Sequence, residues 1–357
     1  MTTHPTAVGH TPRRAVLGRN LTDPSRALHD KDLEAGLKPP VFDEIVIPEE
    51  FGPVDLVVDD LKVKRFAFTQ DDHGDWYLRA GPDGPRIGHA ALLANDLLQL
   101  FTLHYAASQV VGLHTEEELW FDRPVLVGQR VRLAGRYVDT YERRGQGYVV
   151  MEADARDEDG RTLVRHRGVE IMRTTPGEVA GRGSAGGGSG RRVSDAYDTS
   201  LPLAERLGGG TVTGMGLEPL RKEITFEQMA VFSRIGEFVT NIHDSLVTAR
   251  AAGLAVPIVQ GQQLVCYLAE LLTRAFGAEW FCTGWLRVKF LRPVSAFDSV
   301  EAAGAVREVE HDGSRTHIGL DVWVRRGDGS LAAVGWARGE APTSRPARGI
   351  LPFPGHR

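Results

Sequence analysis

The chain has 357 residues, of which 42% are hydrophobic and 25% are charged, and its formal net charge is −5. This length is enough for two domains, and the composition is that of an ordinary soluble globular protein. A net negative charge provides no basic field for a nucleic-acid backbone, so nucleic acid is excluded as the expected partner.

Cysteines and targeting signals point to an intracellular compartment. The only two cysteines, Cys266 and Cys282, stand in apolar surroundings and form neither a CxxC pair nor a disulfide framework. The N-terminus lacks an apolar stretch followed by a cleavage site, and no run approaches the roughly 18 apolar residues of a membrane span. We therefore expect a cytoplasmic protein that does not associate with membranes.

The first half of the chain reads as one α+β unit. Residues 1–37 are polar and aperiodic, which predicts an irregular tail. Within residues 38–175 we expect a short helix over Asp60–Phe68, a long apolar helix over about Gly88–Ala106, and long strands that close the unit.

A linker is expected over residues 176–194, where Gly, Ser and Arg dominate. The segment contains a formal GxGxxG match at Gly181, Gly183 and Gly186. A dinucleotide site requires a strand before such a match and a helix after it. Neither pattern is present, so a flexible linker is the better interpretation.

The second half, residues 195–341, repeats this order and ends in an irregular tail over 342–357. A short helix is expected over Thr225–Ile235 and a long apolar helix over Gln260–Phe276. Alternating polarity, clearest in THIGLDVWV, predicts strands separated by Gly-containing turns. The expected strands are Thr283–Phe290, Ser299–Val309, Arg315–Arg325 and Ser330–Gly339.

Three matched landmarks indicate an internal duplication. FDRPV from Phe121 corresponds to FLRPV from Phe290, and the apolar segments around Ile87 and Ile258 correspond to each other. QDDHGDWY in the first half lies opposite GEFVTNIH in the second, at nearly the same separation. A helix of about 17 residues spans roughly 25 Å, enough to cross an antiparallel sheet. We therefore predict an α+β double hot dog, with two long-helix-in-antiparallel-sheet units fused in one chain.

The string FSRIGEFVTNIHDSLVTARAAGLAVPIVQG ends at Gly261 and resembles a motif of the MaoC-like (R)-specific enoyl-CoA hydratases and acyl dehydratases. That family carries G-D-x-N-P-x-H, then A-R-x-x-G, then P-I-x-x-G. Here Glu237 stands where Asp is usual, the proline is missing, and one extra residue precedes His243. The matching positions are Gly236, Asn241, His243, Ala249, Arg250, Gly253, Pro257, Ile258 and Gly261.

The resemblance covers residues 60–341 and implies reversible elimination of water from a (3R)-3-hydroxyacyl thioester to a trans-2-enoyl thioester. The substrate would be carried on CoA or on an acyl carrier protein, with no cofactor and no metal. The pathway and acyl chain length are not specified, and homodimer formation is left open. The implied catalytic residues are His243, Glu237 and Asn241, and the implied substrate-binding residues are Gly261, Gln260, Val259, Tyr77, Trp76 and Arg292.

These residue types suit that chemistry. His243 titrates near neutral pH and can move the proton on oxygen, while Glu237 and Asn241 can place the water. Gly261 opens a helix whose free N–H groups can polarise the thioester carbonyl. Each residue also has a purely structural interpretation, and Arg292 in particular suits either the thioester's phosphate arm or a surface ion pair.

The first half predicts a degenerate site. Tyr77 lies opposite His243 and Asp75 opposite Asn241, so the resemblance implies that Trp76 and Tyr77 line the acyl pocket. His114 precedes three glutamates, but no HExxH spacing is present, which argues against a metal site. Two other functions stay open at this point: a non-catalytic acyl-binding or partner subunit, and a thioesterase that uses Glu237.

Overall fold

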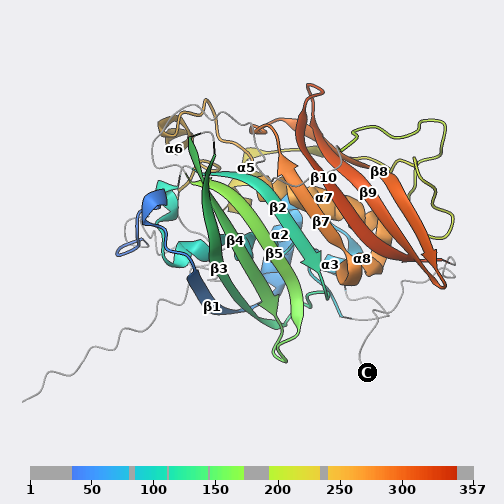
Figure 1. The fold of residues 1–357 in the computed structure, drawn as a ribbon, viewed down its shortest axis with the longest axis horizontal. Helices are drawn as coiled ribbons and strands as arrows, with labels where there is room; N and C mark the ends of the chain where they lie inside the picture. The colour runs from blue at the N-terminus through green and yellow to red at the C-terminus, as the bar shows by residue number, and fades with distance from the viewer. Residues whose placement is uncertain are drawn as a thin grey trace, which may run out of the picture.

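The computed structural model describes residues 34–79, 85–110, 112–143, 145–172, 193–233 and 240–343. Within them lies one ten-stranded antiparallel sheet that curves across the molecule (Figure 1). Its strands are β1 Glu49–Val57, β2 Leu113–Phe121, β3 Arg130–Arg143, β4 Gln146–Arg156, β5 Thr162–Met172, β6 Leu220–Glu223, β7 Trp285–Phe290, β8 Ser299–Asp312, β9 Arg315–Arg326 and β10 Leu331–Pro342.

The order of the strands confirms the duplication. The sheet runs β1-β3-β4-β5-β2-β7-β10-β9-β8-β6, so the second half repeats the first in reverse across the central β2–β7 pair. Phe121 ends β2 and Phe290 ends β7, as the matched FDRPV and FLRPV segments predict. Polar contacts reinforce this junction: Arg287 lies 2.9 Å from Glu116, and Trp285 donates to Glu118 at 2.9 Å.

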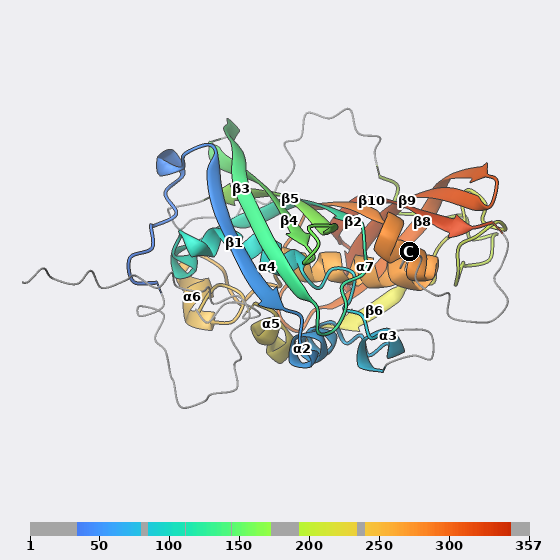
Figure 2. The same cartoon turned by 90° about the horizontal axis from the view of Figure 1, so that it is seen from below.

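The long helix of the second half is α7, Gly261–Phe276, which lies beneath the sheet (Figure 2). The predicted helix over Gln260–Phe276 is confirmed, with Gln260 as its N-cap. Leu264, Val265 and Leu268 are almost completely buried against the sheet, because this apolar helix has a wall of β-strands on one side and further helices on the other.

The equivalent helix of the first half is broken, and the prediction of one helix over Gly88–Ala106 is wrong. Two short pieces replace it, α4 Ala94–Leu98 and the 3₁₀ helix η2 Gln99–Leu103. At the start of the segment a side chain bonds the local backbone: Nδ1 of His89 accepts a hydrogen bond from the Ala91 N–H at 3.1 Å. Such bonds compete with a regular helical ladder.

Shorter helices surround these elements, and the predicted helix over Asp60–Phe68 is confirmed as α2. The helix expected over Thr225–Ile235 is observed as α5, and its last two residues lie outside the described residues. The remaining bounds are α2 Asp60–Gln70, α3 Asp75–Leu78, α5 Phe226–Ser233, α6 Leu246–Ala251 and α8 Trp280–Thr283, with 3₁₀ turns η1 Phe42–Glu44, η3 Ala107–Gln109 and η4 Gly277–Glu279.

The four strands predicted for the second half are present with shifted ends. β7 begins at Trp285 because the preceding residues form α8, and β8 continues to Asp312. The alternation in THIGLDVWV is confirmed, since Ile318, Leu320, Val322 and Val324 all join the main core, whereas Trp323 is buried in a separate cluster. Gly313 adopts a positive φ of 59° in the turn between β8 and β9, a conformation that glycine tolerates.

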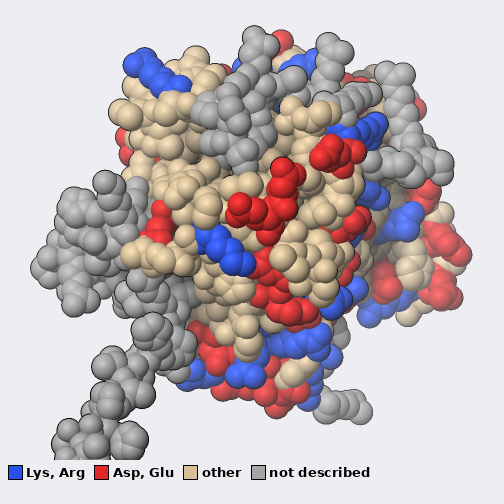
Figure 3. Space-filling model, turned by 60° about the vertical axis from the view of Figure 1, so that its left-hand side comes forward, with Lys and Arg blue, Asp and Glu red and all other residues tan. Residues whose placement is uncertain are grey.

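Most of the predicted tails and linker lies outside the described residues. Of the N-terminal tail, residues 34–37 are described, and the carboxylate of Glu34 accepts a hydrogen bond from the Ser108 N–H at 2.8 Å. Among the described residues no helix is long and apolar enough to span a membrane. Acidic and basic side chains are interspersed on the face shown in Figure 3, without one continuous basic area.

Candidate active site

The loop that carries His243 is held by side chain-to-backbone hydrogen bonds. Oδ1 of Asn241 accepts from the His243 N–H at 2.8 Å, and Oδ1 of Asp244 accepts from the Asn241 N–H at 3.0 Å. Ser245 then caps α6 by accepting from the Thr248 N–H at 3.2 Å. Asn, Asp and Ser favour such turns because their short side chains reach the neighbouring backbone. The Asn241 oxygen therefore fixes the loop beneath the imidazole.

The His243 imidazole has a defined tautomer. Its Nδ1 lies 2.8 Å from the carbonyl oxygen of Ile258. A carbonyl can only accept, so Nδ1 must carry the hydrogen and Nε2 has a free lone pair when the ring is neutral. Burial lowers the pKa of His243 below 6.5, although the Ile258 carbonyl and the Asp244 charge act in the opposite direction. His243 is thus a neutral base at neutral pH.

This imidazole faces a cavity of about 150 Å³ that lies between the two halves of the chain. The second half contributes residues of the His243 loop, the start of α7 and the segment after β7. The first half contributes the broken helix and the facing ends of β2 and β5. The polar side chains in the lining belong to Gln99, His114, Thr115, Glu170, Asn241, His243, Gln260 and Arg292.

The N-terminus of α7 forms another part of the wall. Gly261 is its first residue, and no side chain caps the helix at Gln260. A Cβ atom at Gly261 would lie 3.1 Å from the ring of Phe290. A residue without a side chain avoids this contact and leaves the first N–H groups of α7 open to a ligand. Backbone N–H groups and the helix dipole favour negative charge here, such as that developing on a thioester oxygen.

Asn95 links the two halves and orients two glutamines of the wall. Its Nδ2 donates to the Phe232 carbonyl at 3.3 Å, so its Oδ1 is the acceptor for Gln99 at 3.1 Å and for Gln260 at 2.7 Å. Both glutamine oxygens consequently point away from Asn95. They are buried and have no hydrogen-bond partner among the described residues. The cavity wall therefore offers two acceptors to an N–H or O–H group of a ligand.

Several residues expected at the site lie around this cavity. Val259 is held by a hydrogen bond from its N–H to the Val294 carbonyl at 2.8 Å. Arg292 lines the cavity and donates to the Leu331 carbonyl at 3.2 Å. The structure thus gathers Asn241, His243, Val259, Gln260, Gly261 and Arg292 around one cavity. Glu237 lies outside the described residues.

Trp76 and Tyr77 do not line this cavity, in contrast to the expectation that they form its acyl wall. Trp76 packs against Phe281 with ring centroids 5.3 Å apart, and Tyr77 is buried beside His89 at 5.7 Å. In Figure 2 their helix α3 lies beyond α2 on the lower side of the molecule, away from α6.

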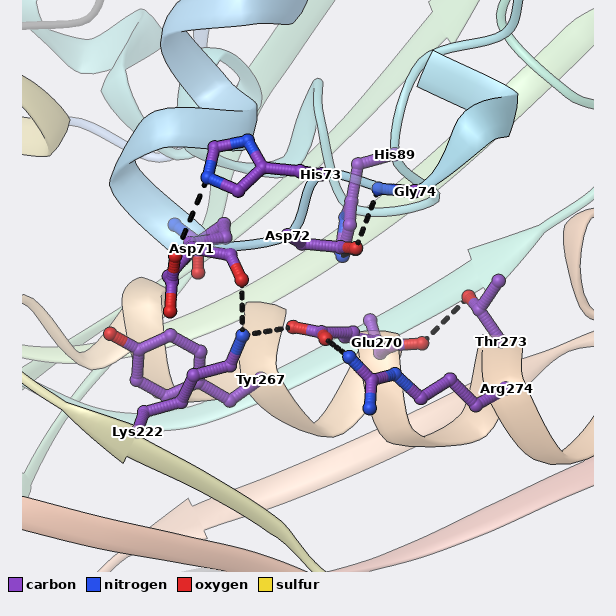
Figure 4. A network of polar contacts seen from close by, with 12 residues as sticks. Asp71, Asp72, His73, Gly74, His89, Lys222, Tyr267, Glu270, Thr273 and Arg274 are labelled. Carbon is purple, nitrogen blue, oxygen red and sulfur yellow. Dashed lines mark hydrogen bonds and ion pairs between the residues drawn. The ribbon is translucent and has the colours of Figure 1, made fainter. Parts of the chain in front are cut away.

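Near Tyr77 a cluster of polar contacts joins the first half to β6 and α7 of the second half, where the sequence comparison would place the counterpart of the His243 loop (Figure 4). Nζ of Lys222 lies 2.8 Å from Glu270 and donates to the Asp71 carbonyl at 2.9 Å. Desolvation raises the pKa of Glu270 to about 7. Asp72 and His89 approach within 3.8 Å in the same cluster. Burial lowers the pKa of His89 to about 4, so this histidine is neutral beside Asp72.

Sequence reasoning did not identify His114, Glu170 and Gln99 as cavity residues. His114 was considered only as a metal ligand, and among the described residues no group of three or more His, Cys, Asp and Glu side chains is arranged to hold a metal. The run EEELWF has no period-two alternation of polar and apolar residues. It gives no sign of the irregularity that turns His114 toward the cavity.

Solved structures share this architecture. A MaoC-like dehydratase superimposes with a TM-score of 0.64 at 13% identity, covering 87% of this chain and 99% of the other. A conserved hypothetical protein from Mycobacterium tuberculosis, described as a double hot dog, gives 0.59 at 15% identity over 85% and 98% of the two chains. The chain has the double hot-dog fold.

A MaoC-like dehydratase from Phytophthora capsici also matches this double hot dog, with a TM-score of 0.54 at 11% identity, over 81% of this chain and 94% of the other. No protein-family model and no curated protein sequence matches the chain. At such identities the likeness establishes the fold, and the function has to be argued from the site.

Proposed function

We propose that this double hot dog is a hydro-lyase that removes water from a (3R)-3-hydroxyacyl thioester to give a trans-2-enoyl thioester, and that catalyses the reverse hydration. One observation carries the proposal: His243, whose Nε2 can accept a proton, and Gly261, at the uncapped N-terminus of α7, line the same cavity. The first can move a proton, and the second can hold the negative charge that forms on the thioester oxygen.

The cavity suits an acyl thioester in other respects. Its wall is largely apolar, with Leu98, Phe101, Leu264 and Phe290 among the lining residues, so it can hold an acyl chain. Asn241 and the residue at 237 would place the water, as the motif implies. CoA and an acyl carrier protein both fit this chemistry as the carrier, and Arg292 at the cavity wall could contact the phosphate arm of either.

Purified enzyme should hydrate trans-2-enoyl-CoA esters, measured as loss of the conjugated thioester absorbance across a series of chain lengths. The His243→Ala variant, run in parallel, should lack this activity. Tight binding of enoyl-CoA without turnover would favour a non-catalytic acyl-binding subunit. Release of free CoA thiol would favour a thioesterase. Either result would overturn the hydro-lyase proposal.

A further inference from the structure

A β-bulge in β2 directs His114 toward the cavity. His114 pairs with Glu170 of β5 and Glu116 pairs with Val169, so Thr115 is the extra residue. Thr115 donates from its hydroxyl to the Val169 carbonyl at 2.8 Å, which stabilises the bulge. Bulges re-aim side chains and are frequent beside active sites. Here the bulge places His114 and Glu170 on one face, and both line the cavity.

The His114 imidazole is held by a buried carboxylate. Its Nε2 lies 3.0 Å from Oε2 of Glu117, and its ring packs at 4.8 Å on Phe290. Glu117 is 1% exposed and is itself fixed, since Nε2 of His166 lies 3.0 Å away and Gln262 donates to its other oxygen at 3.2 Å. A carboxylate beside one nitrogen orients the ring. Nδ1 is buried and has no hydrogen-bond partner among the described residues, so a ligand in the cavity is the partner that remains for it.

The surroundings of the two cavity histidines act in opposite directions. Burial alone would lower the pKa of His114, but the hydrogen bond and charge of Glu117, together with the charge of Glu170, raise it above 6.5. His166 on β5 also adjoins Glu117, while Gln262 of α7 and Phe290 of β7 add no charge. The pKa of His243 is lowered by burial. Pairs of titratable groups shifted apart in this way commonly divide the acid and base roles.

We propose that His114, which the first half supplies to the cavity that His243 also lines, is the general acid of the dehydration and that His243 is the base. This assignment rests on the proposed function. It moves the proton transfer on oxygen from His243, where the sequence motif places it, to His114.

In the dehydration, Nε2 of His243 takes the proton from C2, and the C2–H electron pair forms the C2=C3 double bond. The C3–O bond breaks, and the departing oxygen takes the proton of the His114 imidazolium and leaves as water. His243 ends protonated and His114 neutral, and exchange with solvent restores both. Glu117 is a positioning residue that keeps His114 charged.

The test compares dehydration of a 3-hydroxyacyl-CoA by wild type, His114→Gln, Glu117→Gln and a control, His73→Gln, whose side chain is 55% exposed. Gln at 114 can still donate to Glu117 but cannot transfer a proton, so kcat should fall by about 100- to 10,000-fold with a melting temperature close to wild type. The control should keep wild-type kcat.

The pH profile gives a second readout. Wild-type kcat/KM for dehydration should be bell-shaped. The acid limb, where His243 becomes protonated, should lie below pH 6.5, and the alkaline limb, where His114 loses its proton, should lie above it. Glu117→Gln should move only the alkaline limb to lower pH. If His114→Gln does not fold, this shift and an NMR titration of the wild-type histidines decide the question.

Three results would overturn the proposal. The first is a His114→Gln enzyme that keeps wild-type kcat, or in which only KM is raised, while His243→Ala is inactive. The protein would then catalyse dehydration without His114 as the acid. The second is a Glu117→Gln profile that superimposes on wild type. The third is a His114 resonance that titrates below His243. Absence of dehydration in the wild type would refute the proposed function itself.

Discussion

The Nδ1 atom of His243 lies 2.8 Å from the carbonyl oxygen of Ile258, and this contact joins the His243 loop to the segment that opens α7. It fixes the tautomer of the ring, and His243 and the first residue of α7 line the same cavity. One hydrogen bond therefore positions both His243, the proposed base, and the N-terminus of α7, the proposed binding site of the thioester carbonyl. Substitutions at His243 or at the start of α7 should affect kcat more than the free energy of unfolding.

His243→Ala should therefore reduce kcat for enoyl-CoA hydration by about 100- to 10,000-fold, the usual contribution of general acid–base catalysis. The lost hydrogen bond contributes only about 1 kcal/mol to folding, so the melting temperature should change little. Tyr77→Phe is the matched control, because Tyr77 lies away from the cavity. If both variants lost kcat equally, the proposal that Tyr77 takes no part in catalysis would be wrong.

Gly261→Ala should impair turnover without unfolding the protein. The new methyl group would meet the Phe290 ring at 3.1–3.3 Å and narrow the approach to the N-terminus of α7. Alanine favours the helix by up to about 1 kcal/mol, which offsets part of this contact. A displacement of the bound thioester can cost about 100-fold in rate. Steady-state kinetics should show the loss, and Phe290→Leu in the same chain should restore part of it.

Asn95→Leu should weaken both stability and substrate binding. The change leaves the Gln99 and Gln260 amide groups without their shared acceptor, and each unpaired buried group costs about 1–3 kcal/mol. Differential scanning calorimetry should record a lower melting temperature, and the KM for the enoyl thioester should rise. An unchanged KM would mean that the orientation of the two glutamines does not matter to the ligand.

A fragment of residues 193–357 should not remain a monomer. In the full chain β7 pairs with β2 from Glu116↔Lys289 to Trp120↔Trp285. Removal of the first half would expose this edge and apolar surface, including that around Leu286, which is fully buried in the full chain. Sedimentation velocity should show self-pairing or aggregation, whereas a well-behaved monomer would show that the half is an independent domain.

Local sequence patterns determined much of this architecture. The apolar run from Gly261 to Phe276 predicts α7, and period-two alternation predicts β9, because these patterns report which face of an element is buried. The duplicated landmarks predict two like units. The motif around His243 drew attention to the loop that the structure places against α7, although the role of each residue in it stays a prediction.

Tertiary structure alone decided which elements meet. The aromatic side chains of Trp76 and Tyr77 could line an acyl-binding cavity. The fold instead directs them toward Phe281 and His89. The bulge that turns His114 depends on its register with β5, a partner more than fifty residues away that no local periodicity specifies. The same holds for Asn95, whose partner carbonyl at Phe232 belongs to the other half of the chain.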